Sequence, residues 1–214
     1  REYRAQDDRW MGRNRKRGAM VALNRLLLGE DGAAADFAAE STAAPRLAGR
    51  YAYVVTLDED TRYLPGTVQR LLGAMLHPLN RARRDAQGRR RGYAVLQPAM
   101  QLTARAVQTG YAACMYGAGG VDGYPFSISD FYQDMSGRGN FAGKGIYEVR
   151  AFYEATQGRL NDDAILSHDL IEGILSGAGF LNDVALYDGC PTRLQADLLR
   201  LHRWTRGDWQ LLPA

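Results

Sequence analysis

Apolar residues recur at helical and strand spacings along the chain and predict a series of helices and strands. Between residues 19 and 27 they lie three and four positions apart, on one face of a helix that ends at Gly29. Residues 30–50 are rich in alanine and small polar residues without a clear period, so we expect a connection there with room for a short helix. Residues 53–57 form a short apolar and β-branched run, which predicts a buried strand.

A second helix and a second strand follow. An apolar stripe across residues 68–76 predicts a helix that begins near Pro65, whose fixed φ suits a first helical turn, and ends near Pro78. Residues 93–98 predict a second buried strand. Two strands joined by a helix are typical of a parallel β-α-β unit. The arginines within residues 80–92 repel one another and lack apolar anchors, so we expect a mobile loop there.

The C-terminal half carries further predicted elements. Residues 129–135 favour a short helix, and Ser167 occupies an N-cap position before another. Four apolar residues of that second helix are expected in the core: Leu170, Ile171, Ile174 and Leu175. Residues 180–187 alternate enough to form a strand at a sheet edge or in a hairpin, and residues 192–209 predict a last helix.

The composition is that of an ordinary folded protein. The 214 residues are 46% hydrophobic and 24% charged, enough to bury a core in one domain spanning residues 1–214. A net charge of +3 is mild, so the arginine-rich segments 1–17 and 81–91 indicate solvated surface, or alternatively a site for phosphate, nucleic acid or anionic lipid. Two cysteines without metal-ligand spacing indicate reduced thiols. No run has the apolar length of a membrane span.

An acidic cluster, DED, follows the strand predicted at residues 53–57. Because open α/β sheets bind ligands at the carboxyl ends of their strands, Asp58 and Asp60 are placed for a site. Carboxylates suit Mg²⁺ or Mn²⁺, which usually completes its shell with substrate phosphates. The alternative interpretation, solvated loop carboxylates or helix caps, is the commoner one for an isolated D-x-D triplet.

Three other patterns carry candidate chemistry. Lys144 lies between two glycines, where a backbone and an ammonium could approach a ligand together, although such a triplet is more often a simple turn. Asp169 lies in the first turn of a predicted helix, where it is either a dipole-stabilised cap or a general base. Arg200, Arg203 and Trp204 share one face of the last helix, either to bind phosphate and sugar or as a surface Arg–Trp stack.

Taken together, these runs resemble the glycosyltransferase domain of bacterial cyclic β-1,2-glucan synthases and, more distantly, processive transferases such as cellulose synthase. Seven motifs occur in that family's order: TLDEDT, HPLN, YAVLQP, SDFYQD, GKGIYEV, LSHDLIEG and HRWTRGDWQ. The resemblance implies an α/β nucleotide-sugar glycosyltransferase fold, GT-A-like, with a mixed sheet flanked by helices. It also implies UDP-glucose as donor, Mg²⁺ or Mn²⁺, and inversion at the anomeric carbon to make β-1,2 linkages.

The resemblance assigns roles to individual residues. Asp58 and Asp60 correspond to the metal and diphosphate aspartates, and Asp169, in the triplet SHD, takes the place of the catalytic base. The expected donor-binding residues are Lys16, Asn24, Arg200 and Arg203. The expected acceptor-binding residues are Gly143, Lys144, Gly145, His168, Trp204, Arg206 and Asp208.

The resemblance also sets expectations about context. The superfamily's first β-α unit and its uracil-binding aspartate would precede Arg1, so we expect a core fragment without them. Expected partners are UDP-glucose, a β-glucan acceptor and the remainder of a large synthase at the cytoplasmic face of the bacterial inner membrane, with no nucleic acid. The alternatives are a catalytically silent scaffold fragment and an anion-binding module.

Overall fold

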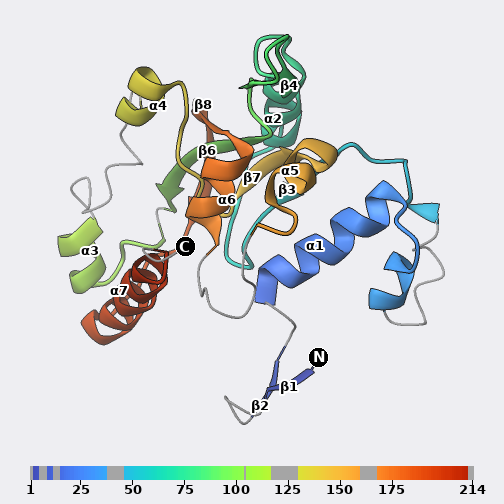
Figure 1. Ribbon diagram of the computed structural model, residues 1–214. Helices are drawn as coiled ribbons and strands as arrows, with labels where there is room; N and C mark the ends of the chain where they lie inside the picture. Colours follow the sequence, from blue (N-terminus) through green and yellow to red (C-terminus); the bar gives the residue numbers. More distant parts are fainter. Residues whose placement is uncertain are drawn as a thin grey trace.

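The computed structural model describes residues 2–4, 9–11, 15–37, 46–103, 105–116, 130–159 and 168–211. They form a mixed α/β fold in which helices flank a four-stranded sheet (Figure 1). The strands are β1 (Glu2–Arg4), β2 (Arg9–Met11), β3 (Tyr53–Thr56), β4 (Arg83–Arg84), β5 (Arg90–Arg91), β6 (Val95–Leu102), β7 (Gly145–Glu148) and β8 (Ala178–Asp188). The helices are α1 (Arg15–Leu28), the 3₁₀ helix η1 (Ala33–Asp36), α2 (Thr67–Leu76), α3 (Gly110–Tyr116), α4 (Phe131–Ser136), α5 (Val149–Thr156), α6 (Asp169–Ser176) and α7 (Leu194–Trp209). Among these described segments, no helix combines the length and apolar character needed to cross a membrane.

The central sheet has the order β3-β7-β6-β8. Strand β7 is antiparallel to β3 and to β6, whereas β6 and β8 are parallel. Strands β3 and β6 therefore run parallel and are joined by α2, as predicted, but they are not hydrogen-bonded to each other, because β7 lies between them and pairs with both. Local periodicity cannot reveal a strand inserted from a distant part of the sequence.

Strand β3 is less buried than its apolar sequence predicts. Tyr53, Val54 and Val55 are half-buried, and only Thr56 is fully buried. The predicted strand is thus present at Tyr53–Thr56, but its predicted burial is wrong, since β3 is an outer strand of the described sheet and has one hydrogen-bonded neighbour. The other outer strand, β8, confirms the edge position expected for residues 180–187.

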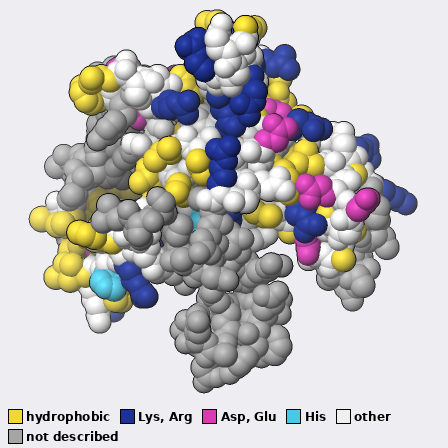
Figure 2. All heavy atoms as spheres, viewed as in Figure 1, with side chains coloured by type: hydrophobic (Ala, Val, Ile, Leu, Met, Phe, Trp, Pro, Cys, Tyr) yellow, Lys and Arg dark blue, Asp and Glu magenta, His cyan; other side chains and the backbone are white. Residues whose placement is uncertain are grey.

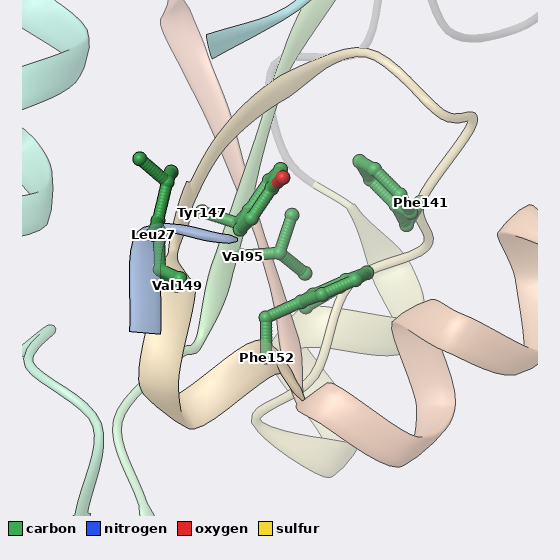
Figure 3. Packing of buried hydrophobic residues seen from close by; sticks show 7 residues of the cluster. Leu27, Val95, Phe141, Tyr147, Val149 and Phe152 are labelled. Atoms are coloured by element: carbon green, nitrogen blue, oxygen red, sulfur yellow. The ribbon is translucent and has the colours of Figure 1, made fainter. Parts of the chain in front are cut away.

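Both faces of the sheet are covered by apolar side chains. On one face, Tyr147 and Val95 pack with Phe141 and Phe152, and α1 contributes Leu27 (Figure 3). The rings of Tyr147 and Phe152 lie 4.6 Å apart between centroids. On the other face, α2 is the principal cover, and its cluster with the sheet consists of Leu71, Met75, Leu96, Ile146 and Val184. The sheet ends are thereby held rigidly enough to position loops.

Helix α6 forms where predicted but turns a different face to the protein. Leu170 and Ile174 are exposed, so their predicted core positions are wrong, and Glu172 and Gly173 are buried instead. A Cβ on Gly173 would lie 2.7 Å from the Cβ of Phe141, so only glycine allows this close approach. The predicted N-cap Ser167 lies outside the described residues.

The arginine-rich segment 80–92 contains a short hairpin where we expected a loop. Strand β4 pairs antiparallel with β5. Asp85 accepts hydrogen bonds from the side chains of Arg89 and Arg91, and from the backbone of Arg89, which ties the turn together. A single carboxylate thus offsets part of the repulsion that motivated the loop prediction.

Candidate functional site

Four segments that are far apart in the sequence meet at one end of the central sheet. Strand β3 leads into Asp58, α1 begins with Lys16 near its first turn, and the loop before β7 contributes Lys144. Helix α6 begins at Asp169. Direct contacts and electrostatic interactions link these four side chains.

Asp58 is held by two ammonium groups. Lys16 Nζ donates to Oδ1 over 2.6 Å, and Lys144 Nζ lies 3.0 Å from Oδ2. Burial alone would raise the pKa of Asp58, but the hydrogen bonds from Lys16 and Lys144 outweigh it and lower that pKa. Asp58 is therefore an ionised carboxylate at neutral pH.

Lys144 also pairs with Asp188, the last residue of β8. The Asp188 carboxylate accepts a second hydrogen bond, 2.8 Å long, from Thr61 Oγ1. Burial alone would lower the pKa of Lys144, but Asp188 and Asp58 outweigh it and raise that pKa, so the lysine stays charged. Sequence reasoning missed the role of Asp188, although its place at the end of a predicted strand was the available signal.

Asp169 lies against the backbone of the loop before β7. A Cβ on Gly143, which has φ +78°, would lie 2.8 Å from the Asp169 carboxylate. The carbonyl of Gly143 accepts a 2.8 Å hydrogen bond from Lys16 Nζ. Burial raises the pKa of Asp169 above its ordinary value, Asp58 adds to the rise, and Lys16 and Lys144 oppose it. This half-buried carboxylate thus has a raised proton affinity, which suits a general base.

Asp60 is exposed beside this cluster. A Cβ on Gly189, the residue after β8, would lie 3.8 Å from Asp60 Oδ2. The loop that carries it is fixed to β8 by backbone hydrogen bonds of 2.7 and 2.8 Å between Arg62 and Tyr187. The acidic loop is thus anchored at the sheet end, as its sequence position predicted.

Asp58 and Asp60 could bind a hard divalent cation together with ligands from outside the protein. Both oxygens of Asp58 already contact lysines, whereas Asp60 is exposed. Within the described ranges, no three His, Cys, Asp or Glu side chains form a complete metal site. Magnesium bound by one or two carboxylates takes its remaining ligands from water and substrate phosphates, a mode that Asp60 and Asp58 could serve.

Three other predicted site residues lie in packed surroundings. Asn24 is 1% exposed, and its Oδ1 accepts a 2.9 Å hydrogen bond from the Tyr147 hydroxyl. His168 is buried immediately before α6. A Cβ on Gly145 would lie 2.1 Å from the carbonyl oxygen of Leu96, so this glycine allows β7 to pair closely with β6. Their substrate-binding roles stay predictions.

Helix α7 packs beside α3 and away from α1 (Figure 1). Arg200 donates to the Tyr116 hydroxyl over 2.6 Å and to Asp197 over 3.0 Å, and it stacks on the Trp204 ring at 4.7 Å. Buried Asp197 also accepts from the Tyr111 hydroxyl. In the described part of the chain, no hydrogen bond or ion pair joins α7 to the cluster around Asp58.

The remaining predicted residues of α7 are exposed. They are Arg203, Trp204, Arg206 and Asp208, whereas Gly207 on the same helix is buried. The predicted Arg–Trp stack is thus present between Arg200 and Trp204. The predicted sugar- and phosphate-binding roles of this helix stay untested predictions.

A cavity of about 270 Å³ opens between α1 and β3 beside the cluster. Its lining includes the polar residues Lys16, Thr56 and Tyr147, and the remaining residues are apolar, among them Met20, Leu23 and Val54. A planar or apolar group could therefore enter next to the Lys16 ammonium.

Comparison with known proteins supports the resemblance based on the seven motifs. The chain is 38% identical, over 217 aligned positions that cover its whole length, to cyclic β-(1,2)-glucan synthase NdvB of Rhizobium meliloti (strain 1021). It spans 8% of the length of that protein. No protein-family model matches the chain. The chain is therefore a homologue of one segment of a cyclic β-1,2-glucan synthase, which confirms the predicted relationship.

Proposed function

We propose that the chain is the catalytic core segment of an inverting glucosyltransferase with a GT-A-like fold. The reaction transfers glucose from UDP-glucose to a growing β-1,2-glucan. The observation that supports it best is the meeting of Asp169, Asp58 and two lysines at one sheet end, in a homologue of a glucan synthase segment. The partners would be a glucan acceptor and the remainder of a large synthase at the cytoplasmic face of the inner membrane.

Asp169 is the general base in this proposal. It takes the proton from the acceptor 2-hydroxyl as that oxygen bonds to the anomeric carbon of the donor, and the bond from that carbon to the diphosphate oxygen breaks. Burial supports the role, because it raises the pKa of Asp169 and so its affinity for the transferred proton. A single displacement of this kind inverts the anomeric carbon.

Lys16 and Lys144 stabilise the negative charge that develops on the departing UDP. Preorganised cations are worth most where solvent is partly excluded, and Lys144 is half-buried between Asp58 and Asp188. Asp188 helps to position Lys144, because it forms a second ion pair with the same ammonium that contacts Asp58. Arg203 and Trp204 are proposed to contact donor and acceptor from α7.

Asp60 and Asp58 would hold Mg²⁺ or Mn²⁺ when the donor is bound. Such an ion supplies further neutralisation of the diphosphate charge. The exposed position of Asp60 favours it as the first ligand, since the oxygens of Asp58 are already engaged by lysines.

The test is calorimetric titration of UDP-glucose and UDP into this chain, with Mn²⁺ and with EDTA. We expect metal-dependent binding that Asp60→Ala weakens about tenfold or more, or about 1.4 kcal/mol. Asp31→Ala, which removes an exposed carboxylate in the turn after α1, is the matched control and should leave binding unchanged. Absence of binding in a folded chain would contradict the proposal and favour the scaffold alternative.

A further inference from the structure

A second concave site lies at the opposite end of β7 from the Asp58 cluster. Lys144 precedes β7 at one end, and Glu148 ends the strand at the other, four residue steps or about 13 Å away. There, a cavity of about 300 Å³ opens between the β4–β5 hairpin and α5. Its charged lining consists of Arg83, Arg84, Arg90, Arg150, Glu148 and Glu154.

The lining carries more positive than negative charge. Four arginines face two glutamates, and Arg84 lies directly opposite Arg90 across the hairpin. Like charges in cross-strand pairs destabilise a sheet. Asp85, the acidic residue of the hairpin, is engaged by Arg89 and Arg91 rather than by this pair. The two arginines are therefore held close together without full compensation.

A hydrogen bond to α6 holds Arg90 in its position opposite Arg84. One of its terminal nitrogens donates a 2.8 Å hydrogen bond to the carbonyl of Leu175, near the end of α6. A helix C-terminus favours a cation, so this contact fixes the guanidinium in place. Burial lowers the pKa of Arg90, and the charges of Arg84, Arg159 and Arg138 lower it further. The guanidinium still has N–H donors for a ligand, because this contact uses one of five.

The surface around the cavity is also basic. Figure 2 shows Lys and Arg side chains gathered in a band that begins at the top of this face, where Figure 1 places β4. Such a band attracts anions toward the cavity, and the concave lining offers forked donors at close range.

We propose that this arginine-lined cavity binds a phosphoryl-bearing anion, at a site separate from the Asp58 cluster. Guanidinium groups match phosphate oxygens bidentately, and several of them around a small concavity suit one or two phosphoryl groups. A bound anion offsets the repulsion between Arg84 and Arg90 and joins the hairpin to α5. The phosphoryl group belongs either to a soluble phosphate or to an anionic lipid headgroup.

The experiment titrates inorganic pyrophosphate in EDTA, and separately vesicles of phosphatidylcholine with phosphatidylglycerol, into the 214-residue chain. We expect one of these probes to bind and the double variant Arg84→Gln, Arg90→Gln to weaken that binding at least tenfold. The same loss must occur in a Lys144→Met background, which separates this site from the cluster at the other end of β7. Arg105→Gln removes an exposed arginine elsewhere and serves as the matched control.

Arg150→Gln keeps the test decisive if the double variant does not fold, because Arg150 approaches the cavity from α5. A several-fold loss is expected for it. The proposal would be overturned if neither probe bound, or if the variants bound as tightly as the native chain. A single-stranded oligonucleotide that binds more tightly than pyrophosphate and depends on the same arginines would also overturn it, in favour of a nucleic-acid site.

Discussion

Asp169 is subject to two opposing requirements. As the proposed base it must be ionised before the reaction, yet it lies in surroundings that favour its protonated form. Its folded-state pKa is raised above the ordinary value of about 3.9. The raised pKa favours the folded state fully at pH values below the pKa of Asp169 in the unfolded chain. This contribution to stability is lost as the pH rises through the pKa of Asp169 in the folded chain. At neutral pH, an ionised Asp169 therefore costs stability.

We predict that Asp169→Asn stabilises the chain at pH 7 while it removes most activity. The amide has no charge to desolvate, so the melting temperature should rise at pH 7 and change little at pH 3. Loss of a general base should lower kcat of the full-length synthase about 10²- to 10⁴-fold. Thermal melts at both pH values and turnover assays check both parts, and near-native turnover would contradict the assigned role.

The sequence identified individual site residues better than their partners. Asp58, Lys144 and Asp169 were each selected from motifs, and the structure places them together. The position of Asp188 after a predicted strand was visible in the sequence, but its pairing with Lys144 and Thr61 was not, because that pairing depends on how β8 lies in the sheet. Pairing across 44 residues leaves no local pattern in the sequence.

At the scale of elements, the loop before β7 approaches α6 only because residue 143 is glycine. Gly143→Ala would bring a Cβ to 2.8 Å from the Asp169 carboxylate. We predict that this variant lowers kcat/KM about 10²-fold, since a displacement of about 1 Å can cost that much. It also strains the backbone, because φ is +78°.

Gly158→Ala separates these two effects. Gly158 has φ +68°, but a Cβ there would meet nothing within 4 Å. It should therefore lose stability by roughly the amount that a strained backbone costs, about 1 kcal/mol, and keep its activity. Equal loss of kcat/KM in the two variants would show that contact with Asp169 is not the cause.

Helix positions were predicted better than the faces those helices bury. Helices α1, α2 and α7 lie where apolar periodicity and Gly or Pro boundaries predicted them. In α6 the apolar stripe did not identify the buried face, because Glu172 is buried by an ion pair and Gly173 by close packing. Both causes are tertiary contacts, and the spacing of apolar residues along the sequence does not predict such contacts.

At the scale of the whole molecule, a buried ion pair fixes α1 against α6. Arg17 Nε lies 3.4 Å from Glu172 Oε1, with side chains 8% and 5% exposed. Arg17 follows Lys16, and Glu172 lies one helical turn after Asp169. The pair therefore sets the distance between Lys16 on α1, which is proposed to stabilise the leaving group, and Asp169 on α6, the proposed base.

Glu172→Gln should destabilise the chain by about 1–3 kcal/mol, because it removes a buried carboxylate charge from beside the Arg17 guanidinium. For a chain of this size the melting temperature should fall by about 5 °C. The matched control is Glu30→Gln, which breaks a shorter pair, 2.9 Å, whose side chains are about one-third exposed. A solvated pair of this kind contributes about 0–1 kcal/mol. If thermal melts show equal losses for the two variants, burial is not what gives the Arg17–Glu172 pair its effect.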